Sequence, residues 1–192
     1  INIHMPDHLG GYIEGGDPHT YMPDIWGYLT IKYALRSVID VGCGTGQNLK
    51  WFRDYRKSPA QGIEGDPSAI VRSMLPEITI LHDYTVGKYV PRHSFDLGLC
   101  TEFAEHVEQQ YEDNWFATLR LCRYVLFSHA TPGQDGYHHV NCQETDYWLK
   151  RFEQNNFSNV ASETKTLRDT NKLIRAPWCR GTLLFFKNNE DL

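Results

Sequence analysis

The sequence has no C-x-x-C pair, no long apolar run and no excess of positive charge. Its five cysteines stand singly among 192 residues. An odd number of cysteines without framework spacing predicts free thiols in a reducing compartment, so we expect a cytoplasmic protein. A membrane span needs about 20 consecutive apolar residues, and no run approaches that length. Neither a secretory signal nor a membrane partner is therefore expected.

The charge balance disfavours one class of partner. Non-specific nucleic-acid binding usually needs a basic face, and a formal net charge of -5 does not predict one. A local basic patch is still compatible with this total charge. Hydrophobic residues at 41% and charged residues at 22% are ordinary for a globular chain. The length suits one domain over residues 1–192, with a glycine-rich leader or lid at 1–23 and a core at 24–192.

Short apolar runs alternate with stretches of helical spacing along most of the chain. Asp24 is expected to cap a helix that runs to about Ser37. The expected strands are 38–41, 60–64, 78–81, 95–100 and 123–128, and the expected later helices are 105–121 and 143–155. Asp66 before Pro67 is predicted to cap a further helix.

The last forty residues change character. Two strands, at about 158–167 and 181–187, are expected with only a loop around 176–178 between them. Five strand–helix alternations that end in a strand pair predict an α/β fold. We expect a Rossmann-like, doubly wound, seven-stranded and mostly parallel sheet with an antiparallel C-terminal strand pair.

Glycines and two acids fall at the ends of three successive strands. Gly42, Gly44 and Gly46 allow a sharp turn and close approach of a ligand to the backbone. Glu64 ends the second strand, where a carboxylate can accept both hydroxyls of a ribose, and Asp83 follows the third, where it can accept from an exocyclic amine. Ligands of doubly wound sheets bind at these carboxyl ends, so the pattern predicts an adenosine site.

Two cofactor classes contain adenosine, and the spacing separates them. A dinucleotide turn prefers G-x-G-x-x-G, but Gln47 stands at the third glycine position. Asp40 before the turn would repel a pyrophosphate and attract the ammonium of an amino-acid tail. S-adenosylmethionine is therefore favoured over a nicotinamide dinucleotide.

Four segments in order resemble the motifs of class I S-adenosylmethionine-dependent methyltransferases. They are residues 38–46 (VIDVGCGTG), 62–67 (GIEGDP), 82–84 (HDY), and 95–100 (FDLGLC) followed by 104–107 (AEHV). Residues 15–21 and 128–141 resemble a bacterial and phage subgroup of these proteins. The resemblance implies a last strand inserted antiparallel between its neighbours, and S-adenosylhomocysteine as the product. The residues expected at the cofactor are Asp40, Gly42, Cys43, Gly44, Gly46, Glu64, Gly65, Asp83, Tyr84, Thr101 and Tyr21.

The methyl acceptor is predicted from side chains near the later strand ends. Glu102, Phe103 and His106 are expected to line its pocket, although His106 could equally orient the loop. Candidate bases are His129, His138 and His139, because imidazole titrates near neutral pH; a polar loop held by its own hydrogen bonds is the alternative. We therefore expect O-methylation of a small molecule, sugar or glycan with a histidine base.

No metal is expected, because adjacent side chains on an extended chain point to opposite faces. His138 and His139 could not then easily share one ion. Tyr12, Tyr21 and Trp26 precede the first strand and could close over the cofactor, since a sulfonium gains from an aromatic face. Tyr21 is the better pocket candidate, because the spacing of Trp26 is that of a core residue.

Other functions remain open at this level. Within the methyltransferases, an RNA, cap or protein acceptor is the alternative to a small molecule. A non-catalytic scaffold that keeps the cofactor fold is a more distant alternative, since a scaffold has no need of Glu64 and Asp83 beside an intact glycine turn.

Overall fold

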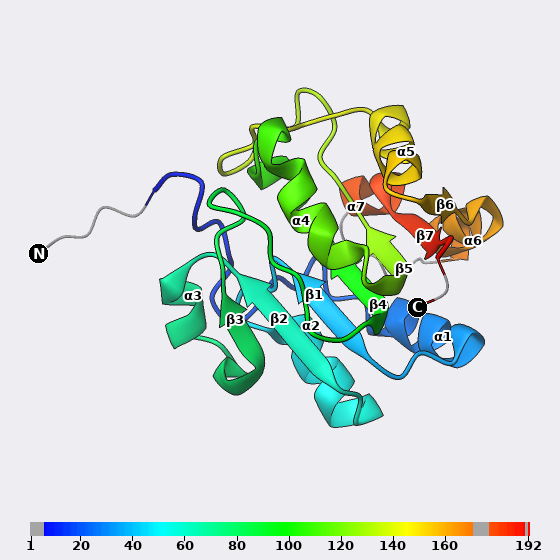
Figure 1. Cartoon of the computed structure of the whole chain (residues 1–192), viewed down its shortest axis with the longest axis horizontal. Helices are drawn as coiled ribbons and strands as arrows, with labels where there is room; N and C mark the ends of the chain where they lie inside the picture. The colour runs from blue at the N-terminus through cyan, green and yellow to red at the C-terminus, as the bar shows by residue number, and fades with distance from the viewer. Residues whose placement is uncertain (1–5, 171–176, 191) are drawn as a thin grey trace, which may run out of the picture.

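Seven strands form one twisted sheet with helices on both of its faces (Figure 1). The computed structural model describes residues 6–170, 177–190 and 192, and the side chains of residues 170, 177 and 178 are also outside the description. The strands are β1 Val38–Val41, β2 Ala60–Glu64, β3 Thr79–Leu81, β4 Phe95–Cys100, β5 Cys122–Phe127, β6 Phe157–Asn159 and β7 Leu184–Asn188.

The strand order is β3-β2-β1-β4-β5-β7-β6. β1 to β5 pair in parallel, whereas β7 runs antiparallel to both β5 and β6. The predicted fold class is therefore confirmed, including the antiparallel strand between its two neighbours. The order reverses between β1 and β4, and the carboxyl ends of these two strands form the crevice in which such sheets bind ligands.

Alternate residues of the central strands pack into two separate cores. Val38, Leu99 and Leu126 face α1 Pro23–Tyr33 and α2 Gln47–Trp51. Ile39, Val125 and Phe127 face α4 Glu112–Leu119 and α5 Thr145–Gln154 on the other side. This period of two, with both faces buried, explains why the strands appear in the sequence as continuous apolar runs. Leu167 and Leu183 extend the first core beneath the C-terminal helices.

The remaining helical segments are short and connect the strands. They are η1 Phe52–Arg56, α3 Pro67–Val71, η2 Pro76–Ile78, η3 Ala104–His106, η4 Gln109–Tyr111, α6 Ala161–Thr170 and α7 Pro177–Thr182. In the described residues, no helix combines the length and apolar character that crossing a bilayer requires.

The first helix begins and ends differently from the prediction. Met22 occupies the N-cap without a side-chain bond, Pro23 is the first helical residue, and Asp24 lies in the first turn rather than at the cap. The helix stops at Tyr33, because Ala34 adopts a left-handed conformation with φ of 51°. The sequence interpretation expected Asp24 to start the helix as a cap. Instead Pro23, whose fixed φ suits the first helical position, starts it.

The predicted helix at 105–121 is wrong over its first seven residues, about two turns. Two 3-10 turns, η3 and η4, occupy this segment before α4 begins at Glu112. Val107 leaves the helical conformation with ψ of 122°. Glu105 and His106 consequently lie in a short 3-10 turn after β4 rather than on the side of an α-helix.

The predicted strand at 158–167 is also largely wrong. β6 ends at Asn159, and α6 begins at Ala161. Glu163 and Leu167 are both 2% exposed, and their separation of four residues places them on one helical face. Lys32 and Tyr33 of α1 bond the Glu163 carboxylate at 2.5 and 2.6 Å, and these tertiary contacts favour the helix. Residues 177–182 form α7 instead of a loop, whereas Ala176 lies outside the described residues.

Candidate active site

A cavity of about 410 Å³ opens beyond the carboxyl ends of the parallel strands. Ligand pockets commonly have about 300–1,000 Å³, so a nucleoside-sized molecule is of suitable size. The predicted residues that line it are Gly42, Cys43, Gly44, Glu64, Gly65, Asp83, Tyr84, Thr101, Glu102, Phe103, His106 and His139. Asp40, Gly46, Tyr21, His129 and His138 are not part of that lining.

The glycine turn follows β1 and is tied to the end of β2. The Gly42 and Cys43 amides donate to the Ile63 carbonyl at 2.9 and 3.1 Å. Gly42 has φ of 73°, and a Cβ built on it would lie 2.3 Å from the Phe103 ring. Only glycine fits this close approach between the β1 turn and the β4 loop. Gly46 is the N-cap of α2 and does not line the cavity.

Glu64 caps the same turn from the end of β2. One carboxylate oxygen accepts from the Gly44 amide at 2.7 Å and the other from the Asp66 amide at 2.9 Å. A carboxylate has about four lone-pair positions, so two bonds leave capacity for ribose hydroxyls. Burial raises the pKa of Glu64 above its ordinary value, against the lowering effect of these amide bonds. Asp66 accepts from the Ser68 amide at 2.7 Å, which confirms it as the cap of α3.

Asp83 lies at the cavity and is bonded by the leader. Its Oδ2 is 2.8 Å from Nε2 of His8, and its Oδ1 accepts from the Thr85 amide and hydroxyl, each at 2.8 Å. Partial burial acts to raise the pKa of Asp83, but the bonds from His8 and Thr85 outweigh it and the pKa is lowered. The sequence interpretation missed His8, whose only sequence signal is its place in the leader.

Asp40 is buried behind the turn rather than on the cavity wall. It is 1% exposed, and its Oδ2 accepts from the Asn48 side chain at 3.2 Å. Burial, together with the nearby Glu64 charge, raises the pKa of Asp40 to about 8, against the lowering effect of the Asn48 bond. Asn48 lines the cavity, so it lies between Asp40 and a ligand.

Residues of the leader form part of the cavity wall. Gln47 Nε2 donates to the Asp17 carbonyl at 2.8 Å, and the Tyr12 hydroxyl pairs with Ser68 Oγ at 2.9 Å. Tyr12 lines the cavity, whereas Tyr21 packs edge-on against buried Trp26 at 5.3 Å. Tyr12 therefore replaces Tyr21 as the aromatic leader residue at the site.

The loop after β4 forms another wall. Glu102 has φ of 51°, its amide donates to Ser128 Oγ at 2.9 Å, and the Ser128 hydroxyl donates back to its carboxylate at 2.7 Å. This reciprocal pair fixes the left-handed turn that directs the following residues toward the cavity. Tyr84 contributes to the lining, but its hydroxyl is paired with buried Thr118 at 2.8 Å.

The three candidate base histidines occupy different environments. His129 is fully buried, and its ring nitrogens lie 3.1 Å from the Ala130 carbonyl and 3.1 Å from the Thr145 hydroxyl. His138 adopts φ of 47° and lies outside the cavity lining. His139 is the member of the three that lines the cavity. His129 and His138 are outside the described cavity lining, so their role as bases stays a prediction.

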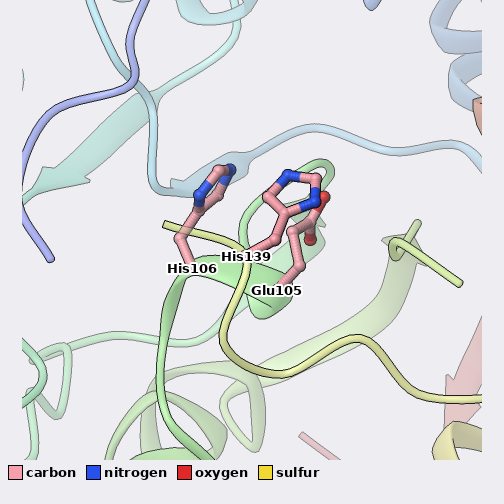
Figure 2. Close-up of side chains that lie close together, drawn as sticks. All are labelled: Glu105, His106 and His139. Carbon is pink, nitrogen blue, oxygen red and sulfur yellow. The ribbon is translucent and has the colours of Figure 1, made fainter. Parts of the chain in front are cut away.

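Glu105, His106 and His139 lie close together, and Figure 2 shows their side chains side by side. His106 and His139 line the cavity, whereas Glu105 is buried behind them. One donor atom from each lies within 4.8 Å of the others. Burial lowers the pKa of His106 to about 4, so its imidazole is neutral at pH 7. Burial also raises the pKa of Glu105 well above its ordinary value, and the Glu102 charge adds to this. The sequence interpretation placed Glu105 at the start of an expected helix and did not include it among the site residues.

A comparison with protein families matches residues 29–131 to the family described as methionine biosynthesis protein MetW. The chain belongs to the MetW family. The matched segment contains the glycine turn, Glu64, Asp83 and the loop after β4, and thus most of the cavity wall. No curated protein matches the chain in sequence.

Solved structures resemble the MetW-family chain throughout the sheet. A sugar N-methyltransferase, KedS8 from Streptoalloteichus sp ATCC 53650, has a TM-score of 0.68 at 13% identity and covers 92% of this chain and 90% of its own. An S-adenosylmethionine-dependent methyltransferase from Clostridium acetobutylicum ATCC 824 has a TM-score of 0.65 at 9% identity, with coverages of 88% and 91%. The small RNA methyltransferase HEN1 has a TM-score of 0.61 at 14% identity and covers all of this chain but 27% of its own.

These structures confirm the class I methyltransferase fold predicted from the motifs. Their acceptors differ, according to their names, from a sugar to a small RNA. The shared fold therefore leaves the acceptor of this MetW-family chain to be argued from its own cavity.

Proposed function

We propose that this chain is an S-adenosylmethionine-dependent methyltransferase that methylates a hydroxyl group of a small molecule or sugar. The carrying observation is one cavity with two chemically different walls. The glycine turn, Glu64 and Asp83 form the first wall, and Glu102, His106 and His139 form the second. The first wall matches the functional groups of adenosine, and the second provides bases for an acceptor.

The cofactor half of the proposal follows from hydrogen-bonding capacity. The free lone pairs of Glu64 can accept from the ribose hydroxyls, and Asp83 can accept from the adenine amine in place of His8. Asp40, ionised on binding, attracts the ammonium group through Asn48 or a water molecule. The similarity in fold to a named S-adenosylmethionine-dependent methyltransferase supports this assignment.

The transfer half needs alignment and one proton acceptor. The acceptor oxygen attacks the methyl carbon in line with the sulfonium sulfur, a C–O bond forms, and the C–S bond breaks with its electron pair on sulfur. The hydroxyl proton passes to the imidazole of His139 or His106. Alignment of two bound reactants can supply about 7–11 kcal/mol of the acceleration.

Isothermal calorimetry of the full chain tests the cofactor assignment. We expect saturable 1:1 binding of S-adenosylhomocysteine and no saturable heat with NAD. Glu64→Gln replaces one acceptor oxygen by a donor beside the Gly44 or Asp66 amide, so affinity should fall at least tenfold. The matched control is Glu77→Gln, because Glu77 is exposed and pairs with Arg53 away from the cavity. If the full chain does not bind S-adenosylhomocysteine, the proposal is overturned.

Methyl transfer from labelled S-adenosylmethionine tests the acceptor class. Matched pairs of sugars and small molecules that differ only in a hydroxyl or an amine at one position should be labelled on the hydroxyl member. Preference for the amine, for RNA or for a protein acceptor would contradict the hydroxyl assignment. Cofactor binding without transfer to any of these acceptors would favour the scaffold alternative.

A further inference from the structure

The carboxylate of Glu105 is buried without a partner. Glu105 is fully buried, and among the described residues neither of its carboxylate oxygens has a hydrogen-bond partner. Removing a carboxylate from water without compensation is costly, and buried carboxylates are usually paired with a cation or coordinate a metal. A ring nitrogen of His106 and one of His139 lie within 4.8 Å of a Glu105 carboxylate oxygen.

Both histidines are oriented as metal ligands commonly are. His106 Nδ1 lies 2.7 Å from the Tyr137 carbonyl, and His139 Nδ1 lies 3.0 Å from the Gln134 carbonyl. A carbonyl oxygen only accepts, so each Nδ1 is the donor and Nε2 is the nitrogen left to bind a metal. A bond from the second nitrogen to a carbonyl typically fixes the tautomer and ring of a metal-binding histidine.

The backbone holds the two segments of the cluster together. The carbonyl of Glu105 accepts from the Val140 and Asn141 amides at 2.9 and 3.1 Å. These bonds join the loop that carries His139 to the 3-10 turn that carries Glu105 and His106. A Cβ built on Gly136 would lie 2.1 Å from His139 Nε2, so the glycine leaves space for the ring. The cluster is thus built across two loops by specific contacts.

We propose that Glu105, His106 and His139 bind a divalent cation at the edge of the cavity, where the two histidines line it and Glu105 lies buried behind them. Two imidazoles and one carboxylate form a borderline donor set, suited to Zn²⁺, Co²⁺ or Mn²⁺ rather than to Ca²⁺. Bonds of about 2.1 Å place ligand atoms about 3.4 Å apart in a tetrahedral site. The observed limit of 4.8 Å requires only a small closure of the side chains.

Three protein ligands leave a coordination position open toward the cavity, which His106 and His139 both line. An acceptor hydroxyl bound there would lose its proton more readily, as metal-bound water does. This role rests on the proposed function, whereas cation binding itself does not. With both Nε2 atoms bound to the cation, the hydroxyl proton would pass to solvent or to the Glu102 carboxylate instead of to a histidine.

Titration of the metal-free full chain with Co²⁺ and with Zn²⁺ tests the site. We expect one equivalent of Co²⁺ to produce visible absorption bands and Zn²⁺ to displace it, with Mg²⁺ at least a hundredfold weaker by calorimetry. Glu105→Gln and His139→Asn should each weaken binding at least tenfold. The matched control is His138→Asn, because asparagine tolerates its φ of 47° and His138 is outside the cluster.

Gly136→Ala retains all three ligands but crowds the His139 ring, so it should also weaken binding. It serves as a second test if Glu105→Gln fails to fold, as judged by circular dichroism. Failure of the wild type to bind either ion, or equal binding by the ligand variants, would overturn the site. Calorimetry with S-adenosylhomocysteine is run separately on the same metal-free sample. Loss of cation binding, which would overturn the metal site, is thus distinguishable from loss of S-adenosylhomocysteine binding, which would overturn the proposed function.

Discussion

At the residue scale, Asp40 is an acid held in its neutral form by its surroundings. Burial raises its pKa to about 8, whereas the ordinary value for an aspartate is about 3.9. The folded chain consequently binds one more proton than the unfolded chain between these two values. Stability from this residue is full at acid pH and is lost as the pH rises toward 8.

Asp40→Asn should therefore flatten the pH dependence of stability. Without ligand, the wild type should lose about 2 kcal/mol more than the variant between pH 6 and pH 8. The Asn48 bond can persist, because an asparagine side chain still offers an acceptor oxygen. Urea denaturation of both proteins at the two pH values measures the difference, and parallel pH profiles would contradict this account of Asp40.

At the element scale, the leader is held against the glycine turn by Gln47, the residue that follows Gly46. Gln47, the residue that argued against a dinucleotide, donates its amide to the Asp17 carbonyl. A Cβ on Gly16 would lie 2.2 Å from Gln47 Oε1 and 2.7 Å from its Cβ, so rotation of the side chain cannot relieve the clash. Gln47, which stands where a dinucleotide turn has its third glycine, thus holds the leader beside the cavity.

Gly16→Ala should loosen the leader and release the bound cofactor product faster. We expect the dissociation rate of S-adenosylhomocysteine to rise about tenfold, equivalent to about 1.4 kcal/mol. Gly15→Ala is the control, because φ of 81° at Gly15 is similar to 92° at Gly16 but nothing lies within 4 Å of its Cβ. Stopped-flow fluorescence measures both rates, and equal rates in the two variants would exclude a lid role for this contact.

At the scale of the whole molecule, Glu112 joins α4, α5 and the loop that carries His139. It is 1% exposed and accepts from Asn141 at 2.9 Å, from Tyr147 at 2.8 Å and from Arg151 at 2.6 Å. Asp113 also bonds Arg151, at 3.0 Å, but its side chain is 65% exposed. Glu112 and Asp113 therefore pair with the same arginine, Arg151, but only the Glu112 pair is shielded from water and should contribute much to stability.

Glu112→Gln should destabilise the chain by about 3 kcal/mol, because it leaves buried partners without a charged acceptor. Asp113→Asn should change stability by less than about 1 kcal/mol, since exposed pairs contribute little. Urea denaturation at pH 7 compares the two variants with the wild type. Equal losses in both variants would show that burial of Glu112 does not determine the strength of this network.

The central strands and the cofactor turn were predictable because their signals are local. Strands buried on both faces have apolar runs, and residues 38–41, 60–64 and 95–100 match β1, β2 and β4 at both ends. Asp66 was predictable as a cap because its bond to Ser68 spans two residues. α6 was not, because Glu163 depends on Lys32 and Tyr33 far back along the chain.

The sequence alone determined the class I methyltransferase fold and the adenosine-binding character of its crevice. Both depend on backbone conformation and burial, which short segments specify through periodicity and glycine. Only the tertiary structure decided which histidines reach the cavity and that Glu105 joins two of them. The reason is physical: that cluster is held by hydrogen bonds between two distant loops, and no local pattern encodes which loop carbonyl a ring will meet.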